Sequence, residues 1–523
     1  MLKERDLNQI DNLGINKDII GKQLDRFKNG FPYMKLIRPA TENDGIYVLK
    51  PHREKRYEET YDQGTVSHSI TKFVPASGAA SRMFKDLTSF YNEFDIDNDN
   101  FDSFVKDNGL KSVKEFFEKL YRFAFYNELM DTIENAGIKY DLLSENEKYK
   151  TVLKYLLTDV GLNYNNKPKG LLAFHFYYNK YRTAVSEHLV EGARYARQAD
   201  GNVNIHFTIS QEHRELFEEL VDSKIDKYES DFNVKYNISY SYQSASTDTI
   251  AVDNNNEPFR NEDGSILFRP GGHGALIENL NKLEEDIIFI KNIDNVVPDF
   301  LKQNTIRYKK IIGGLLLTAN RIINSYQSRI VAGDYTNDTI EAIEQFIEVQ
   351  LSVILPKSYY QLDAEKKIEE LKRILNRPLR VCGMVKNEGE PGGGPFWVKN
   401  KHGEISLQIV ESAQVDMNNK DQKDIVSRST HFNPVDIVCS FKDWSGVALD
   451  LNNFIDDNTG FISEKSKDGK TLKALEHPGL WNGAMSDWNT IFVEVPDTTF
   501  NPVKTVNDLL RPEHQSLSST NSN

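Results

Sequence analysis

The residues that most clearly suggest chemistry form a loop of small side chains between an apolar strand and a helix. The segment runs Lys72-Phe-Val-Pro-Ala-Ser-Gly-Ala-Ala-Ser-Arg-Met-Phe-Lys85. Small residues let backbone N–H groups approach a polyanion closely, and the positive end of the following helix dipole favours negative charge there. The candidate phosphate-contacting residues are Ala76, Ser77, Gly78, Ala80 and Ser81, with Arg82 as a fixed cation at the mouth of the loop. An ordinary strand–turn–helix junction is the alternative.

A second segment pairs a Pro-Lys dipeptide with another apolar strand and helix. Lys167-Pro-Lys-Gly-Leu-Leu-Ala-Phe-His175 precedes a helix that begins near Arg182. Read across the intervening helical stretch, the two segments resemble the signature of sugar-nucleotide pyrophosphorylases, G-x-G-T-R-[LM] followed by P-K-x-[LM]. The resemblance implies that Gly78, Ala80, Ser81, Arg82 and Lys169 occupy the signature positions, with Arg82 and Lys169 catalytic.

A glycine-rich turn and an acidic strand end extend the resemblance. Gly271-Gly-His-Gly274 precedes Asp286-Ile-Ile-Phe-Ile-Lys-Asn-Ile-Asp-Asn295. In UDP-sugar pyrophosphorylases, which these segments resemble, such a turn packs against the nucleotide base, and an Asp at the strand end lies beside the metal-bound α-phosphate. The resemblance implies nucleotide binding by Gly271, Gly272, His273 and Gly274, and Mg²⁺ binding by Asp294. A plain turn and an Asx-type cap are the alternatives, and His273 is expected to be structural rather than a base.

Three C-terminal segments add further expectations from the same resemblance. Glu411 in a predicted hairpin and Asn433 in Phe432-Asn-Pro-Val-Asp-Ile437 would bind the sugar, and Lys504 in Phe500-Asn-Pro-Val-Lys504 would reach the phosphates. The chain departs from the family pattern at two positions. Ala80 replaces the second signature glycine, which phosphate cradling tolerates only if that residue keeps a negative φ. Asp436 stands where sugar-contacting members have Asn.

Composition excludes several classes of function. The chain has 523 residues, 39% hydrophobic and 27% charged, as in a globular protein of two or three domains. A net charge of −14 argues against nucleic acid or an anionic membrane as the main partner. The N-terminus has no apolar signal region and no apolar run approaches the ~18 residues of a membrane helix, so we expect a cytoplasmic location. Cys382 and Cys439 are flanked by apolar residues, which predicts buried free thiols.

Hydrophobic periodicity predicts the elements that must position these residues. A helix is expected over Asp18–Lys28, alternating strands over 203–209 and 236–242, and a buried strand over 286–290. Strands alternating with helices imply a doubly wound α/β sheet. The expected organisation is an N-terminal helical and extended region (1–70), a nucleotide-binding α/β core (71–295) with a helical insertion (86–166), a helical block (296–378), a sugar-binding C-terminal α/β region (379–515) and a disordered tail (516–523). The resemblance adds that the core is Rossmann-like, with the mixed sheet of the GT-A type, two helical insertions and a C-terminal β-containing region.

The motifs together predict a nucleotidyltransferase that forms a nucleoside-diphosphate sugar from a nucleoside triphosphate and a sugar 1-phosphate. Mg²⁺ would be the cofactor, because carboxylate and phosphate oxygens are its preferred ligands. Two alternatives stay open. One is a GT-A-type glycosyltransferase with a nucleoside-diphosphate sugar as donor, and the other is a non-catalytic protein that binds such a sugar. The whole chain also resembles a bacterial family described only as a domain of unknown function.

Overall fold

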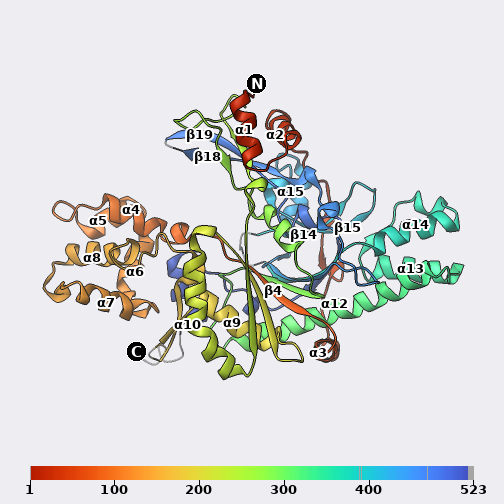
Figure 1. The fold of residues 1–523 in the computed structure, drawn as a ribbon, viewed down its shortest axis with the longest axis horizontal. Helices are drawn as coiled ribbons and strands as arrows, with labels where there is room; N and C mark the ends of the chain where they lie inside the picture. The colour runs from red at the N-terminus through yellow and green to blue at the C-terminus, as the bar shows by residue number, and fades with distance from the viewer. Residues whose placement is uncertain (1, 179, 388, 390–391, 468, 516–523) are drawn as a thin grey trace. The chain divides into compact units, whose positions relative to one another are not determined.

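The computed structural model describes residues 2–178, 180–387, 389, 392–467 and 469–515, and its elements are labelled in Figure 1. The expected tail at 516–523 lies outside these residues. The chain divides into two compact units. Unit 1 comprises Met1–Phe73, Ser241–Ile290 and Tyr308–Pro496, and unit 2 comprises Val74–Tyr240, Lys291–Arg307 and Asp497–Asn523. Each unit is therefore assembled from three separate stretches of chain.

Unit 1 contains most of a mixed sheet and two smaller antiparallel sheets. Its strands are β1 (Leu36–Pro39), β2 (Thr41–Glu42), β3 (Gly45–Tyr47), most of β4 (Ile70–Pro75), β9 (Thr249–Val252), β10 (Phe268–Arg269), most of β11 (Ile287–Lys291), β12 (Val353–Ile354), β13 (Leu379–Lys386), β14 (Gly394–Lys399), β15 (Ile405–Val410), β16 (His431–Phe432), β17 (Asp436–Ser440), β18 (Phe461–Lys467), β19 (Lys470–Glu476) and β20 (Asn489–Glu494). The mixed sheet has the order β2-β3-β20-β13-β17-β11-β4, and the smaller sheets have the orders β1-β14-β15-β12 and β10-β9-β19-β18.

Pairing in the large sheet follows the apolar character of its strands. β11 pairs parallel with β4, and β13 pairs parallel with β20 but antiparallel with β17. All five residues of β11 are buried, as expected for a parallel strand covered on both faces. The α/β class with a mixed sheet is confirmed, and the GT-A type stays a prediction.

The helices of unit 1 are α1 (Glu4–Asn12), α2 (Lys17–Asn29), α3 (Pro51–Gly64), α11 (Ile277–Leu280), most of α12 (Lys302–Val331), α13 (Asn337–Val349), α14 (Ala364–Leu375) and α15 (Lys420–Ser427). The helix predicted over Asp18–Lys28 is confirmed as α2, whose first turn is capped by the Asn16 side chain. Cys382 and Cys439 are buried free thiols in the core, as predicted. Burial raises the pKa of Cys382 to about 11, so the thiol is unreactive at neutral pH.

Unit 2 joins several strands to a set of helices. Its elements are the end of β4, α4 (Lys85–Glu93), α5 (Phe101–Asp107), α6 (Lys111–Glu118), α7 (Tyr126–Asn135), α8 (Glu145–Leu157), β5 (Ala173–Tyr177), β6 (Lys180–Thr183), α9 (Ala184–Tyr195), β7 (Asn202–Ile209), α10 (Arg214–Phe232) and most of β8 (Lys235–Tyr242). β4, β7 and β8 follow one another in the sheet. The strands predicted over 203–209 and 236–242 are β7 and β8.

The helices α4 to α8 form a group between β4 and β5 (Figure 1). Aromatic side chains hold them together: the rings of Phe90 and Phe94 stack 4.5 Å apart, and those of Phe101 and Tyr149 stack 4.2 Å apart. Such pairs add roughly 0.5–1.5 kcal/mol each beyond the area they bury. Among the described residues, no helix is long and apolar enough to cross a bilayer.

Candidate functional site

The small-residue loop follows β4, whose last strand-like hydrogen bond runs from Ala76 N to Thr208 O at 2.8 Å. The helix expected after the loop is α4. The loop ends in a single 3-10 turn, Ala80–Arg82, and α4 begins at Lys85. Phe84, with φ −105° and ψ 14°, lies outside helical geometry and separates the two. The loop therefore lacks the aligned dipole of a full helix, and its own N–H groups must carry any anion binding.

Three consecutive backbone N–H groups in the loop are available to bind an anion. Within the described part of the chain, the N–H groups of Ser77, Gly78 and Ala79 make no hydrogen bond. Gly78 and Ala79 are exposed, and a Cβ built on Gly78 would meet no atom within 4 Å. Successive unpaired N–H groups at a turn form anion-binding concavities. The loop thus offers free backbone donors to a phosphate.

Ala80 has the negative φ that phosphate cradling requires of an alanine at this signature position. It is absent from the positive-φ residues of the described chain, and its side chain is fully buried. Its N–H donates to Lys167 O at 3.2 Å. Because the position has a negative φ, alanine fits where the signature has glycine.

The two halves of the split signature lie side by side. Ala79 and Pro168 form an antiparallel bridge, and Lys169 N donates to Gly78 O at 3.2 Å. Lys169 starts a short 3-10 turn that ends before β5. The backbone of the loop and the backbone of the Pro-Lys dipeptide therefore hold each other in place.

The Lys169 side chain reaches two further predicted segments. Its Nζ lies 2.8 Å from Asp294 Oδ2 and donates to Val503 O at 2.8 Å. Both side chains of the ion pair are mostly buried, at 17% and 18% exposure. Val503 N in turn donates to Asp294 O at 3.2 Å. Lys169 thus connects the acidic strand end to the C-terminal segment that carries Lys504.

Lys504 and Arg82 complete this group. Both side chains are exposed, and Arg82 makes no ion pair with any residue that the structure describes. The C-terminal segment also contacts the loop directly, because Val506 N donates to Met83 O at 3.2 Å. We call the loop 77–82 together with Lys169, Asp294 and Lys504 the phosphate cluster.

The phosphate cluster suits a magnesium ion that is held mainly by substrate. No group of three or more His, Cys, Asp or Glu in the described chain is placed to bind a metal. Asp294 uses Oδ2 for Lys169, and its Oδ1 has no partner among the described residues. Mg²⁺ in phosphoryl-transfer sites is commonly bound by one or two carboxylates plus phosphates. A single free carboxylate oxygen beside phosphate-binding groups fits that pattern.

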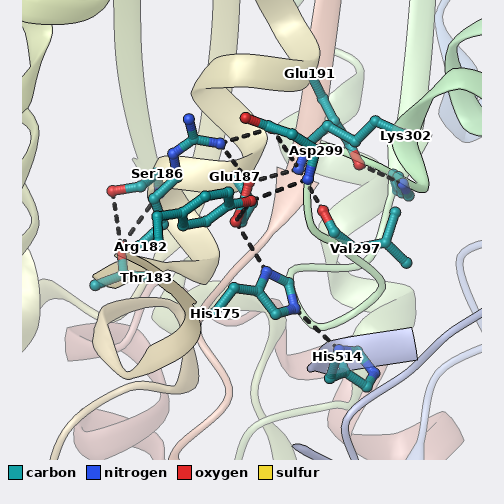
Figure 2. A network of polar contacts seen from close by, with 12 residues as sticks. His175, Arg182, Thr183, Ser186, Glu187, Glu191, Val297, Asp299, Lys302 and His514 are labelled. Carbon is teal, nitrogen blue, oxygen red and sulfur yellow. Dashed lines mark hydrogen bonds and ion pairs between the residues drawn. The ribbon is translucent and has the colours of Figure 1, made fainter. Parts of the chain in front are cut away.

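A buried polar network in unit 2 surrounds Glu187 of α9 (Figure 2). The Glu187 carboxylate is 2.8 Å from His175 Nδ1, accepts from Tyr177 OH at 2.8 Å and pairs with Lys302 Nζ at 2.5 Å. Arg182 lies 3.3 Å away. Burial alone would raise the pKa of Glu187, but Lys302, His175 and Arg182 outweigh it and hold that pKa far below the usual value. Glu187 is therefore a buried carboxylate anion.

Two imidazoles link this carboxylate to the C-terminal segment. His175 Nε2 lies 3.0 Å from His514 Nδ1, and the two ring planes are 13° apart (Figure 2). Burial lowers the pKa of both histidines, so both are neutral at pH 7. Because Glu187 accepts from His175 Nδ1, His175 Nε2 must accept from His514. The network thereby anchors the segment that brings Val503 and Lys504 to the phosphate cluster.

The same helix fixes the chain before Asp294. Lys291 and Glu191 form an ion pair at 2.8 Å with both side chains almost fully buried, and His188 Nε2 contacts Ile293 O at 3.1 Å. Sequence reasoning assigned no role to Glu187 or Glu191. Two acidic residues one helical turn apart in the otherwise apolar stretch 184–195 are the signal that predicts buried partners.

The glycine-rich turn 271–274 belongs to unit 1. Close contacts with another segment of this unit explain why glycine occupies these positions. A Cβ on Gly274 would lie 2.1 Å from Pro478 O, and one on Gly271 would lie 2.2 Å from His477 Cδ2. Gly272 has a φ of 79°. The turn therefore needs glycine to pack against 476–479, and contact with a nucleotide base stays a prediction.

His273 is held by the residues after that packing segment. Its ring stacks on Trp481 with the centroids 4.2 Å apart, and its Nδ1 accepts from Leu480 N at 3.0 Å. Burial lowers the pKa of His273 to about 4, so the ring is neutral at pH 7. Its Nε2 therefore carries the proton, 3.9 Å from Glu411 Oε1. This donor role agrees with the expectation that His273 is not a base.

Glu411 lies beside His273, whereas Asn433 is engaged by backbone. Glu411 is 30% exposed and accepts from Asn482 Nδ2 at 2.7 Å. Asn433 is buried, donates to Gly383 O at 3.1 Å and accepts from Val435 N at 3.1 Å. Asp436, which stands where the family pattern has Asn, forms a buried ion pair with Lys309. Lys309 therefore neutralises the negative charge at this position. Glu411 and His273 thus form one group in unit 1, while Asn433 is held by Gly383 and Val435.

The family described as Domain of unknown function (DUF4301) matches residues 3–515. None of the curated proteins matches. Similar solved structures include uridine diphosphate N-acetylglucosamine pyrophosphorylase from Trypanosoma brucei, with 12% identity over 94% of this chain and 74% of that one, and a TM-score of 0.49.

Two further structures are of the same kind. UDP-glucose pyrophosphorylase from Leishmania major is 12% identical over 97% of this chain and 77% of that one, with a TM-score of 0.43. UDP-glucose phosphorylase from Trypanosoma brucei is 13% identical over the same shares, with a TM-score of 0.45. Likeness at this level carries no conclusion about the reaction, which must be argued from the residues of the site.

Proposed function

Because the chain belongs to the family Domain of unknown function (DUF4301), whose description names no reaction, we propose its function from the residues of the site. We propose a nucleotidyltransferase that joins a nucleoside triphosphate to a sugar 1-phosphate, releases pyrophosphate and forms a nucleoside-diphosphate sugar. The glycosyltransferase and the non-catalytic binding protein are the competing readings that the experiment below distinguishes.

One observation carries the proposal: Lys169 contacts three segments that lie far apart in sequence. Its N–H donates to Gly78 O, and its Nζ contacts both Asp294 Oδ2 and Val503 O. These segments hold the motifs that resemble those of sugar-nucleotide pyrophosphorylases, in the same order along the chain. The ammonium group of Lys169 thus joins two residues that lie 125 and 334 positions away, and its backbone N–H holds the small-residue loop.

The phosphate cluster has the groups that this reaction needs. An anionic oxygen of the sugar 1-phosphate attacks the α-phosphorus, and the bond from that phosphorus to the pyrophosphate oxygen breaks. The nucleophile is already ionised, so the site needs no general base. It must align two anions and neutralise the charge on the α-phosphate and the leaving pyrophosphate. Arg82, Lys169, Lys504 and the free N–H groups of residues 77–79 supply that positive potential.

Asp294 would hold Mg²⁺ through Oδ1, and the bound ion would neutralise charge on the phosphate oxygens. The Lys169–Asp294 ion pair keeps an ammonium and a carboxylate side by side at 2.8 Å. A phosphate accompanied by its cation requires that combination, because the ammonium binds the anion and the carboxylate binds the cation. Lys291 and His188 hold the chain before Asp294 and so orient its carboxylate.

The group in unit 1 supports a sugar as the second substrate. Glu411 accepts hydrogen bonds, and the neutral His273 donates from Nε2. An acceptor and a donor side by side match the hydroxyl groups of a sugar. The base and the sugar are to be identified by screening.

A coupled pyrophosphate-release assay tests the proposal with four nucleoside triphosphates, a set of sugar 1-phosphates and Mg²⁺. We expect turnover with one combination and a fall of about 10²–10³-fold in Lys169→Ala, the loss typical of removing one charge-stabilising group. Lys154→Ala, an exposed lysine on α8, is the control and should keep full activity. Full activity in Lys169→Ala would refute the assignment. Sugar transfer to an acceptor, or binding of a nucleoside-diphosphate sugar with neither reaction, would favour the two competing readings.

A further inference from the structure

A polar cavity lies in unit 1 and is made of residues outside the predicted site. It has a volume of about 500 Å³ and is lined by α3, α12 and the turn after β17. Small-molecule sites usually measure roughly 300–1,000 Å³, so the cavity can hold a compact ligand. Asp286 at the start of β11 forms part of its wall.

The walls of this cavity are fixed by close packing and by an ion pair. A Cβ on Gly64 of α3 would lie 2.3 Å from Leu317 Cδ1 of α12, so the two helices approach closely at the floor of the cavity. Lys442 pairs with Asp286 Oδ1 at 2.7 Å, while Ser69 N and Oγ donate to Asp286 Oδ2 at 2.8 and 2.9 Å. These contacts hold the turn after β17 against the start of β11.

The acidic groups of the wall are already satisfied. Asp286 is neutralised by Lys442 and hydrogen-bonded by Ser69. Asp443 accepts from Ser445 N at 2.9 Å, from Ser445 Oγ at 2.7 Å and from Val447 N at 3.0 Å, so its carboxylate caps its own turn. Asp286 is thus engaged through both carboxylate oxygens, and Asp443 is engaged through Oδ1.

The other polar side chains that line the cavity include three carboxamides and one guanidinium. Gln63 of α3 and Asn320, Arg321 and Asn324 of α12 all line the cavity, and none of the four side chains makes a hydrogen bond or ion pair with another described residue. Asn320 and Asn324 are four residues apart and Arg321 and Asn324 three apart, so both neighbours lie beside Asn324 on α12. Among the described lining residues, Arg321 is thus a cation without a carboxylate partner, beside carboxamides.

An indole completes the wall. Trp444 also lines the cavity and is 42% exposed, whereas Trp397 and Trp488 are buried in the core. A flat apolar face beside carboxamides suits a ring that carries several hydroxyl groups. An unpaired guanidinium suits a phosphate, with which it forms strong charge-assisted hydrogen bonds.

We propose that this cavity binds a phosphorylated sugar, with the phosphate on Arg321, the hydroxyl groups on Gln63, Asn320 and Asn324, and the ring against Trp444. The ligand would contact both α3 and α12 and so stabilise their packing. Since no residue of the phosphate cluster takes part, the inference stands or fails separately from the proposed transferase reaction.

Isothermal titration calorimetry with glucose 6-phosphate tests the inference on the full-length protein and on Lys169→Ala, which disables the phosphate cluster. We expect binding that is unchanged in Lys169→Ala and weakened about tenfold or more in Arg321→Gln, as for the loss of one charge-assisted contact. Trp444→Ala should weaken binding severalfold, and Arg321→Lys should restore part of the affinity. Lys55→Ala, an exposed lysine on α3 outside the cavity, is the control and should bind normally.

Three results would overturn the inference. The first is the absence of binding at millimolar glucose 6-phosphate by a folded protein. The second is binding that disappears in Lys169→Ala but persists in Arg321→Gln. The third is equal affinity for unphosphorylated glucose or for inorganic phosphate, because the site requires both parts of the ligand. Circular dichroism of each variant verifies that it is folded.

Discussion

Replacing Glu187 by Gln removes one negative charge from the centre of the buried network in unit 2. The wild-type carboxylate is fully buried and is surrounded by His175, Tyr177, Arg182 and Lys302. Glutamine keeps one acceptor oxygen but presents an NH₂ group where the protein supplies donors. Lys302, whose side chain is 3% exposed, loses its main counter-charge. Its remaining partners among the described residues are the Val297 carbonyl oxygen and Asp299 Oδ1, and Asp299 Oδ1 lies 3.5 Å from Lys302 Nζ.

The magnitude follows from the burial of both partners. Breaking a buried ion pair by removing one partner costs about 3–5 kcal/mol, because the other charge stays buried without compensation. For a folding unit of 150–250 residues each kcal/mol lowers the melting temperature by about 2–4 °C, so the transition of unit 2 should fall by roughly 6–20 °C. The loss includes the anchoring of His514, so the C-terminal segment should also loosen.

Differential scanning calorimetry measures the change, and hydrogen exchange of α9 and residues 497–515 locates it. Glu218→Gln in the exposed Arg214–Glu218 pair is the matched control, with an expected effect of at most about 0.5 kcal/mol. The double variant Glu187→Gln/Lys302→Met removes both charges and should recover part of the lost stability. A single variant that melts within about 1 °C of wild type would show that Glu187 is not a buried, paired carboxylate.

Three further predictions follow from single positions. Burial lowers the pKa of His206 to about 4, so below pH 6.5 this histidine binds a proton in the unfolded protein but not in the folded one. The free energy of unfolding should therefore fall by about 3 kcal/mol as the pH drops from 6.5 to 4. His206→Gln should flatten this pH dependence, which the urea midpoint measures. Gly274→Ala should destabilise unit 1 by about 1–3 kcal/mol because its Cβ meets Pro478 O, while Gly21→Ala in α2, which meets nothing within 4 Å, should be neutral or stabilising in the same calorimetric assay. Ala80→Gly should leave turnover within about twofold and lower stability by about 0.4–1 kcal/mol, because the position already has a negative φ; a large gain in turnover would contradict this.

Local patterns in the sequence predicted the elements well where short-range effects decide the structure. The apolar spacing over Asp18–Lys28 predicted α2, and the alternation in 236–242 predicted β8. The helix expected after the small-residue loop is α4, but the pattern did not indicate the 3-10 turn and the non-helical Phe84 that precede it. Motif order also predicted that Gly78, Lys169 and Asp294 belong together, and the structure brings them into contact.

Long-range contacts account for what the sequence could not predict. The glycines at 271 and 274 reflect packing against residues 477 and 478, more than 200 positions away. Asn433 has the residue type of a sugar ligand, yet backbone groups of Gly383 and Val435 occupy its amide. Glu187 could be recognised as a charge in an apolar helix, but its partner Lys302 is 115 residues away. Local periodicity contains no information about such partners.

Pyrophosphate exchange tests the central claim most directly. Labelled pyrophosphate, Mg²⁺ and each nucleoside-diphosphate sugar are incubated with wild type, Lys169→Ala and the exposed control Lys154→Ala. The account predicts that wild type and Lys154→Ala convert one nucleoside-diphosphate sugar to labelled nucleoside triphosphate, and that Lys169→Ala does so about 10²–10³-fold more slowly. Equal incorporation by Lys169→Ala, or none by wild type with any of the nucleoside-diphosphate sugars, would contradict it.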